Sequence, residues 1–162
     1  MIAGRKKQCC ISFPGLLLFI VLFATTSPAE EVVKLSKGQT VYVPVYSHIY
    51  GGPKSTPLQL TATLSIRNTD TVSPITIHSA DYYDSEGKLL SKYVTEDLRL
   101  NSLASTRYIV KTYDKSGGSG ANFIVKWSAR EKVNAPIIEA VMIGQRHSFV
   151  SRGQVITDRS KQ

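Results

Sequence analysis

The clearest pattern in the chain is an alternation of apolar and polar residues over Leu58–Arg67. Leucine, alanine and isoleucine occupy the even positions of this segment, and polar side chains occupy the odd positions. Side chains alternate between the two faces of a β-strand, so this period of two predicts a strand with one buried face and one solvated face. Turn-forming residues at Asn68–Thr71 and Asp84–Gly87 separate it from two further strands. The segment Leu58–Leu90 is therefore the best-defined part of the predicted fold.

Further strands are predicted on both sides of this segment. Pro44 cannot donate a backbone hydrogen bond, so its strand is expected to be an edge strand or to carry a bulge. Phe123, Val125 and Trp127 share one parity, which predicts that the only tryptophan points into the core. The segments between strands are predicted to be loops, with a short helical turn possible in 95–105. The predicted strands are 39–46, 58–67, 75–83, 88–94, 106–113, 122–130, 137–145 and 147–152.

Short strands separated by turn residues, with no helix-period run after residue 29, predict an all-β fold. We expect an antiparallel immunoglobulin-like β-sandwich of about seven or eight strands, with a β-barrel as the alternative. The sandwich domain is expected to cover 39–153. A flexible lead-in is expected at 30–38 and a flexible tail at 154–162.

Residues 1–29 have the layout of a secretory signal peptide. Arg5, Lys6 and Lys7 precede the apolar run Leu16–Ala24, and Ser27–Ala29 supplies small residues for cleavage. The run is shorter than the roughly 20 apolar residues that a spanning helix needs. We therefore expect an exported protein, periplasmic or extracellular, with no stable membrane span in the mature chain. An uncleaved membrane anchor is the alternative.

Cleavage after Ala29 would leave 133 residues (162 − 29) and would remove both cysteines, Cys9 and Cys10. A mature domain without cysteine depends on packing rather than on disulfides. The net charge of +8 would fall to +5, from 17 basic and 12 acidic residues. This scattered charge fits ordinary solubility, or attraction to an anionic surface. No nucleic-acid partner is expected for an exported protein.

Four motifs stand out beyond the strand pattern. They are TATLSIRNTD at Thr61–Asp70, DYYDSEGKLL at Asp81–Leu90, GGSGANFIV at Gly117–Val125 and EAVMIG at Glu139–Gly144. Together they resemble a bacterial family of small exported proteins that is known only as a domain of unknown function. The resemblance extends over most of Thr40–Gly153 and implies a bacterial source and an exported domain. The family has no established activity, so the resemblance implies no catalytic or binding residue.

The loop Asp114–Gly120 contains three glycines and lies near Lys111 and Lys126. Consecutive backbone N–H groups in such a turn can bind an anion. The P-loop signature is absent and no helix follows, so nucleotide binding is not indicated. The alternative is that the glycines permit unusual backbone angles or close packing. The candidate ligand-binding residues in this loop are Lys115, Gly117, Gly118, Ser119 and Gly120.

Two other patterns are weaker indications of a functional site. Ser119 lies in Gly-Gly-Ser-Gly-Ala, which is close to the nucleophile elbow of serine hydrolases, but a strand follows it instead of a helix. Asp81, Asp84 and Glu86 surround a turn without the ligand spacing of a calcium-binding loop. Neither pattern predicts a catalytic residue or a metal site.

The histidines are a further possibility. His48, His78 and His147 are possible metal ligands, and Met142 adds a soft donor of the kind that copper sites use. No two histidines show close ligand spacing, and three separate loop or surface histidines are the simpler interpretation. We therefore predict no metal and no cofactor.

Tyrosine is frequent, with eight residues. Tyr42 and Tyr46 fall opposite the valine face of their strand and beside Pro44, so they are predicted to be exposed. Exposed tyrosines are enriched at interfaces because the ring is apolar and the hydroxyl can form a hydrogen bond. The alternative is that they pack at a strand edge. If exposed, they indicate a partner protein or a glycan.

No assembled catalytic constellation is visible in the sequence. The expected function is therefore a non-enzymatic interaction or accessory module of the bacterial envelope, binding an envelope protein or a glycan. One alternative is a periplasmic metal- or small-ligand-binding protein that uses its histidines. The other is an enzyme of unrecognised type. We expect any site to lie in the loops 47–57 and 114–120, or at Tyr42 and Tyr46.

Overall fold

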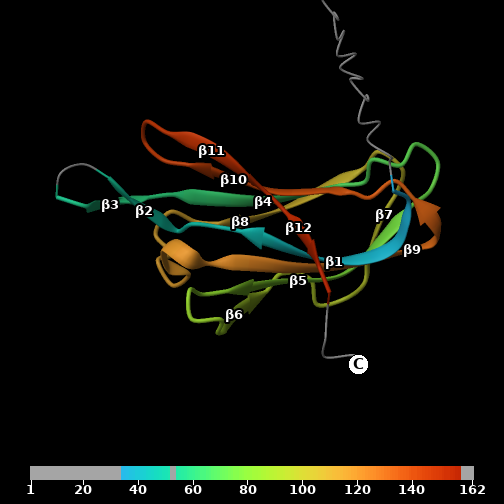
Figure 1. Ribbon diagram of the computed structural model, residues 1–162, viewed down its shortest axis with the longest axis horizontal. Helices are drawn as coiled ribbons and strands as arrows, with labels where there is room; N and C mark the ends of the chain where they lie inside the picture. The colour runs from blue at the N-terminus through green and yellow to red at the C-terminus, as the bar shows by residue number, and fades with distance from the viewer. Residues whose placement is uncertain (1–33, 52–53, 158–162) are drawn as a thin grey trace, which may run out of the picture. The chain divides into compact units, whose positions relative to one another are not determined.

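The computed structural model describes residues 34–51 and 54–157 (Figure 1). The predicted signal peptide and the first part of the predicted lead-in lie outside the described residues. The described strands are β1 Ser36–Pro44, β2 His48–Gly51, β3 Thr56–Gln59, β4 Thr61–Arg67, β5 Ile75–Tyr83, β6 Leu89–Lys92, β7 Leu98–Leu100, β8 Ser105–Val110, β9 Asn122–Val133, β10 Ile137–Ile143, β11 Ser148–Arg152 and β12 Gln154–Ile156.

Two antiparallel sheets form the domain (Figure 1). The larger sheet has the strand order β12-β1-β9-β5-β6, with β7 also paired to β5. The second sheet has the order β11-β10-β4-β8, and β2 and β3 form a separate hairpin. This arrangement confirms the predicted all-β antiparallel sandwich.

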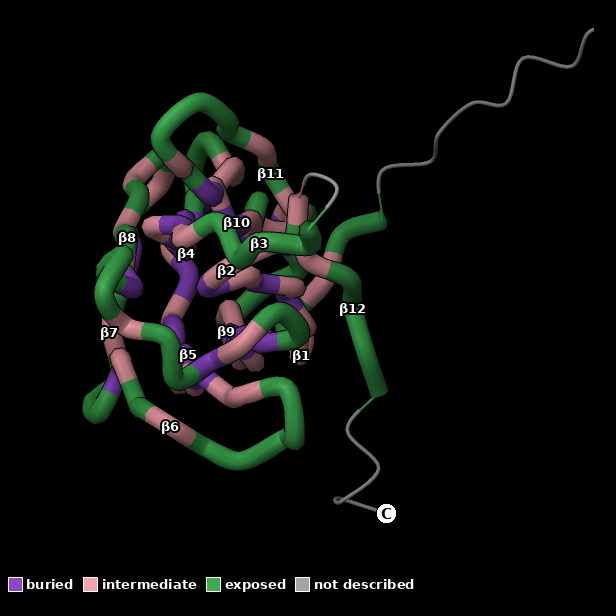
Figure 2. Tube along the Cα trace, turned by 90° about the vertical axis from the view of Figure 1, so that its left-hand side faces the viewer, coloured by how far each residue is buried: buried purple, intermediate pink, exposed green. Residues whose placement is uncertain are grey.

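The core lies between the two sheets (Figure 2). In β4 the apolar even residues Ala62, Leu64 and Ile66 are buried, as the alternation predicts, and of the odd residues only Ser65 is also buried. Trp127 is buried, as predicted, and the Phe123 ring stacks 4.9 Å from the Tyr82 ring, centroid to centroid. Burying one large apolar side chain contributes about 1.5–3 kcal/mol, so this single cluster supplies the main stabilisation.

The structure extends the domain beyond its predicted bounds. Gln154–Ile156, which we expected in a flexible tail, forms β12 and pairs with Thr40–Tyr42 of β1. Ser36–Gly38, expected in the lead-in, belongs to β1. The segment 95–105 contains the short strand β7 rather than a helical turn. Strands of three or four residues are too short to show a periodic pattern, which explains why β2, β7 and β12 escape sequence analysis.

The position of β1 differs from the predicted edge. It lies between β9 and β12, but β12 pairs only as far as Tyr42. Pro44 lies beyond the end of β12, and its carbonyl oxygen accepts a hydrogen bond from Ser151 Oγ at 2.6 Å. In an antiparallel ladder the N–H and C=O of one residue point to the same side. The nitrogen of Pro44, which carries no hydrogen, therefore faces the side where no strand pairs with this residue.

Gly153 is the single residue between β11 and β12, which belong to different sheets (Figure 1). A Cβ atom at this position would lie 2.5 Å from Cγ1 of Val41 and 2.8 Å from the backbone oxygen of Ile138. The crossing therefore needs glycine, because any larger residue would push the two sheets apart.

Asp70 connects two turns of the sandwich. Its carboxylate accepts backbone hydrogen bonds from Ser73 at 2.8 Å, Val72 at 3.0 Å and Asn134 at 3.1 Å. These N–H donors, Ser73 first, hold the pKa of Asp70 below its ordinary value. The ionised carboxylate thus ties the turn after β4 to the turn after β9.

A lowered pKa in the folded state means that ionised Asp70 stabilises the fold above its unfolded pKa of 3.8. This contribution is lost as the pH falls through the folded pKa. Asp70→Asn keeps one oxygen acceptor but turns an amide donor toward the Asn134 N–H. We expect urea unfolding to show a smaller stability loss between pH 7 and about pH 3 for Asp70→Asn than for the unaltered chain. An exposed control, Glu131→Gln, should match the unaltered chain, and equal pH dependence in all three would contradict this prediction.

Candidate functional site

The predicted glycine loop is bound tightly to the rest of the domain. The Gly117 carbonyl accepts hydrogen bonds from Ser85 N and Ser85 Oγ, both at 3.0 Å. The Gly118 carbonyl accepts from Ser47 N at 3.0 Å and Ser47 Oγ at 2.9 Å. The Gly118 N–H donates to Lys115 O, and the Gly120 N–H donates to Ser85 Oγ. Two of the N–H groups that an anion site would use are thus engaged within the protein.

Close packing accounts for the glycines themselves. A Cβ atom on Gly117 would lie 2.7 Å from Cζ of Tyr82 and closer still to its hydroxyl oxygen. Gly118 has a φ of +75°, which favours glycine. Lys115 and Ser119 are exposed at the loop surface. The geometry therefore matches the close-packing alternative for this loop.

Two glycines of this loop give a matched test. We expect Gly117→Ala to lower the free energy of unfolding by about 1–3 kcal/mol, because the added methyl group overpacks the buried Tyr82 ring. Gly120→Ala should cost less, since its Cβ would lie 3.2 Å from the Ser85 hydroxyl, a contact that a small shift of the side chain relieves. Urea titration of both variants measures the difference. Equal stability of the two variants would contradict the packing role of Gly117.

Tyr42 and Tyr46 are both half-buried and contact different parts of the fold. Tyr42 lies within β1, with Gln154 of β12 and Ile124 of β9 as its cross-strand neighbours. The Tyr46 ring packs edge-on against Phe149 of β11, with centroids 5.9 Å apart. The structure thus places the two tyrosines against different sheets.

His78 lies on a different sheet from the segments that carry His48 and His147. His48 Nε2 lies 3.2 Å from the Tyr50 hydroxyl in the β2–β3 hairpin, and His147 lies in the turn between β10 and β11. His78 projects from β5 on the other sheet. Within residues 34–51 and 54–157, no three His, Cys, Asp or Glu side chains gather as metal ligands.

Of the acidic residues near the β5–β6 turn, Asp84 stabilises the turn itself. Asp84 Oδ1 accepts backbone hydrogen bonds from Glu86 at 2.9 Å and Lys88 at 2.8 Å. Gly87 completes the turn with a φ of +79°. Such bonding is the usual role of aspartate at a hairpin turn.

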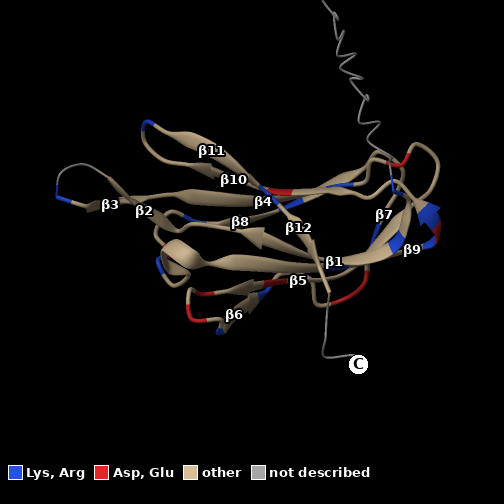
Figure 3. Ribbon diagram, viewed as in Figure 1, with Lys and Arg blue, Asp and Glu red and all other residues tan. Residues whose placement is uncertain are grey.

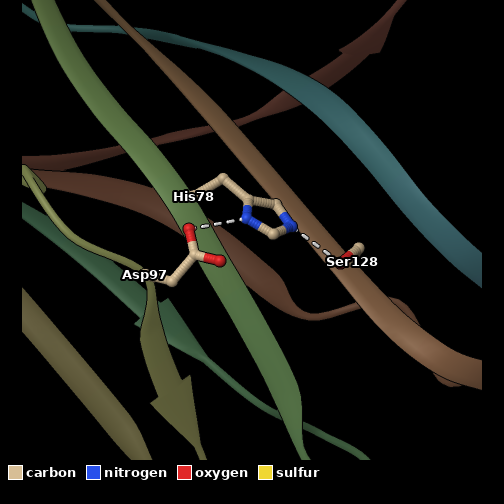
Figure 4. A network of polar contacts seen from close by, with 3 residues as sticks. All are labelled: His78, Asp97 and Ser128. Carbon is tan, nitrogen blue, oxygen red and sulfur yellow. Dashed lines mark hydrogen bonds and ion pairs between the residues drawn. The ribbon is translucent and has the colours of Figure 1, made fainter.

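His78 joins residues from three segments on the outer face of the larger sheet (Figure 4). Its Nδ1 lies 2.8 Å from Asp97 Oδ1, in the connection between β6 and β7. Its Nε2 lies 2.7 Å from Ser128 Oγ on β9. The carboxylate, imidazole and hydroxyl therefore form one continuous chain of hydrogen bonds.

A β-bulge orients His78 toward this chain of hydrogen bonds. Ile77 pairs with Trp127, but Ser79 pairs with Lys126, so His78 is the extra residue on β5. Such a bulge redirects a side chain locally. The burial pattern records the same shift, because buried positions are odd up to Ile77 and even from Ala80 onward.

The direction of the two hydrogen bonds follows from their chemistry. An ionised carboxylate only accepts, so His78 Nδ1 carries a proton and donates it to Asp97. When the ring is neutral, Nε2 carries a lone pair and accepts a hydrogen bond from the Ser128 hydroxyl. This is the arrangement in which a histidine acts as a general base toward a serine.

A shallow groove of about 590 Å³ adjoins Ser128. Gly38 of β1 pairs with Ser128, so no side chain covers the hydroxyl from that strand. We call this region the Ser128 groove; its lining includes His78, Lys126, Ser128, Gly38, Val155 and Ile156.

A second hollow, the end pocket, has a volume of about 710 Å³. It lies between the β3–β4 junction and the β10–β11 turn, and Leu58, Ile143, Arg146 and His147 line it. Gln59, which also lines it, has a buried side-chain oxygen with no hydrogen-bond partner among the described residues. The pocket is within the size range of small-ligand sites.

The outer surface of the four-stranded sheet, which we call the open face, carries aliphatic residues. Ile109, Ile137, Ile143 and Val150 have exposed fractions between 48% and 54%. Val141 of β10 pairs with Val150 on one side and with Thr63 on the other, and Thr63 pairs with Ile109. A mainly aliphatic row, interrupted on β4 by Thr63, therefore crosses the sheet from β11 to β8; we call Val150, Val141, Thr63 and Ile109 the aliphatic row.

Sequence analysis missed both the His78 network and the open face. The parity change between Ile77 and Ala80 was visible in the sequence as a bulge signal. The sequence IIEAVMI of β10 has Glu139 as its only polar residue, which indicates a strand that is apolar on both faces. The pairing of His78 with Asp97 and Ser128 has no local signal, because these residues are 19 and 50 positions from His78.

The described residues contain no helix that is long and apolar enough to cross a membrane. The profile of a family described as a protein of unknown function, DUF3124, matches residues 38–156. The chain belongs to the DUF3124 family. This confirms the predicted membership of a family of unknown function, and the match begins and ends within two residues of β1 and β12.

The other comparisons add little about this DUF3124 domain. No curated protein matches the chain. The crystal structure of Thermotoga maritima 1070 is similar to it at 8% sequence identity and a TM-score of 0.39, over 72% of this chain and 90% of that one. Similarity at this level carries no argument about fold or function.

Proposed function

We propose that this DUF3124 protein is an exported accessory module of the bacterial envelope that binds a partner protein through its open face. The observation that carries the proposal is the half-exposed aliphatic row on the four-stranded sheet. Soluble monomeric proteins rarely expose a large contiguous apolar patch, and such patches commonly mark interaction sites.

The charged residues of the open face indicate which kind of partner surface would bind there. The charged residues of its four strands are Arg67, Arg107, Glu139 and Arg152, which gives three positive charges and one negative charge. Arg67 Nε lies 4.0 Å from Glu139 Oε1, a long ion pair in which the Arg67 side chain is exposed and the Glu139 side chain is largely buried. A partner surface with aliphatic residues and carboxylates would complement this face.

The side of the domain that carries β6 has more acidic than basic residues. Asp84 and Glu86 precede β6 and Glu96 and Asp97 follow it, whereas Lys88 and Lys92 are the basic residues between them (Figure 3). An acidic partner is therefore repelled from the β6 side and attracted to the open face, which favours one orientation of binding.

The end pocket extends the open face. Ile143 lines the pocket and also lies on the open face, and Thr61 of β4 is beside it. A partner side chain in the pocket could contact the apolar side chains of Leu58 and Ile143, and buried pockets of this kind are where binding energy concentrates in protein interfaces.

The open face provides a closely matched pair of variants. Val150 on β11 and Val155 on β12 have the same exposed fraction, 54%, but Val155 lies outside the open face. We expect Val150→Glu to weaken binding of the partner at least about 10-fold, through loss of apolar contact and repulsion of its carboxylates. Val155→Glu should leave binding within about 2-fold.

The measurement starts with capture from a bacterial envelope fraction, followed by purification of the captured protein and calorimetric titration of each variant. Equal weakening by Val150→Glu and Val155→Glu would exclude the open face as the binding surface. Concentration-dependent self-association, or binding only to anionic vesicles, would also contradict a protein partner.

Export has its own test. We expect full-length protein produced in a bacterial host to be recovered outside the cytoplasm with Glu30 as its first residue, 29 residues shorter than the translated chain. Intact-mass measurement of the exported fraction gives the cleavage site. Recovery of the uncleaved chain in the cytoplasmic fraction alone would contradict export.

A further inference from the structure

We propose that Ser128 is an activated nucleophile and that the Ser128 groove is an acyl-transfer site for small esters. This activity goes beyond the proposed partner binding, because the groove lies on the larger sheet and the open face lies on the four-stranded sheet. The proposal rests on the contacts of His78, on the access to Ser128 and on the lining of the groove.

The contacts place each group in the role it needs. Asp97 accepts from His78 Nδ1 at 2.8 Å and holds the ring with its Nε2 lone pair toward Ser128, 2.7 Å away. A serine hydroxyl is a weak nucleophile until a base removes its proton. His78 is thus the general base, and Asp97 is a positioning residue that acts through His78.

Access to the hydroxyl comes from the neighbouring strand. Gly38 pairs with Ser128 and has no side chain, so an ester carbonyl can approach over β1. A Cβ on Gly38 would lie 3.4 Å from Cβ of Ser128 and would narrow this approach. The bulge on β5 brings His78 to the other side of the same hydroxyl.

The lining of the groove indicates the substrate. Val155 and Ile156 of β12 provide an exposed aliphatic wall suited to a short acyl chain. Lys126 lies two residues before Ser128 on β9 and lines the same groove, so its positive charge favours an oxygen that becomes negative. These features select small esters with an apolar acyl group.

The proposed reaction needs only the ester and water. Ser128 Oγ forms a bond to the carbonyl carbon of the ester while His78 Nε2 takes the hydroxyl proton. The bond from that carbon to the alcohol oxygen breaks, and His78 returns the proton to the departing alcohol. Water then attacks the acyl-serine with His78 again as base, releasing the carboxylic acid and restoring the Ser128 hydroxyl.

The exposure of His78 and Asp97 to solvent limits the rate acceleration that they can provide. The His78 and Asp97 side chains are 41% and 65% exposed, so water screens their interaction. General base catalysis contributes about 10²–10⁴-fold in enclosed sites. We therefore expect an acceleration nearer to the lower end of this range.

Two probes test the nucleophile directly. Full-length protein is treated with a fluorophosphonate, which labels activated serines, and its hydrolysis of p-nitrophenyl butyrate is measured. We expect the label on Ser128 by peptide mass spectrometry. Labelling and hydrolysis should fall at least about 10-fold in Ser128→Ala and in His78→Ala.

The controls separate chemistry from folding. Ser91→Ala alters an exposed serine of β6 that lies outside both the Ser128 groove and the open face, and it should retain full reactivity. Asp97→Asn should reduce hydrolysis without changing the unfolding midpoint, and Asp97→Glu should partly restore it. No label on Ser128, or undiminished labelling in folded His78→Ala, would overturn the proposal, whatever the result for partner binding.

Discussion

Face-to-face burial of two sheets is the interaction on which this domain depends. The described residues contain no cysteine, so no disulfide joins the two sheets. Stability comes from one apolar cluster shared by both sheets. The crossing at Gly153 belongs to the same constraint, because the chain changes sheet at a point where a Cβ atom would strike Val41 and Ile138.

The two outer faces of the sandwich differ in chemistry. The four-stranded sheet presents aliphatic side chains and arginines to solvent. The larger sheet presents the His78–Asp97–Ser128 network (Figure 4), which adjoins the Ser128 groove. A sandwich can carry both because its core uses only the inner face of each sheet. Partner binding on one face and acyl transfer on the other therefore place no conflicting demands on the same residues.

The bulge at His78 shows how a small irregularity creates chemistry on a regular scaffold. Without the extra residue, β5 would keep a single alternation along its whole length, and the residues after Ile77 would face the opposite side of the sheet. With it, two consecutive residues lie outside the core, and the imidazole reaches Ser128. The glycine loop illustrates the opposite case, since its conspicuous composition serves packing against Tyr82 and Ser85.

The sequence by itself determined the all-β class, the inward parity of β4 and the burial of Trp127, because a period of two is a local property of a half-buried strand. The polar turn at Asp84–Gly87 was predictable for the same reason, since its bonds join near neighbours. Only the tertiary structure decided that β12 covers part of β1, that the aliphatic row crosses four strands, and that Asp97 and Ser128 meet His78. Those contacts depend on which distant strands become neighbours, and strand order is set by the packing of the whole chain.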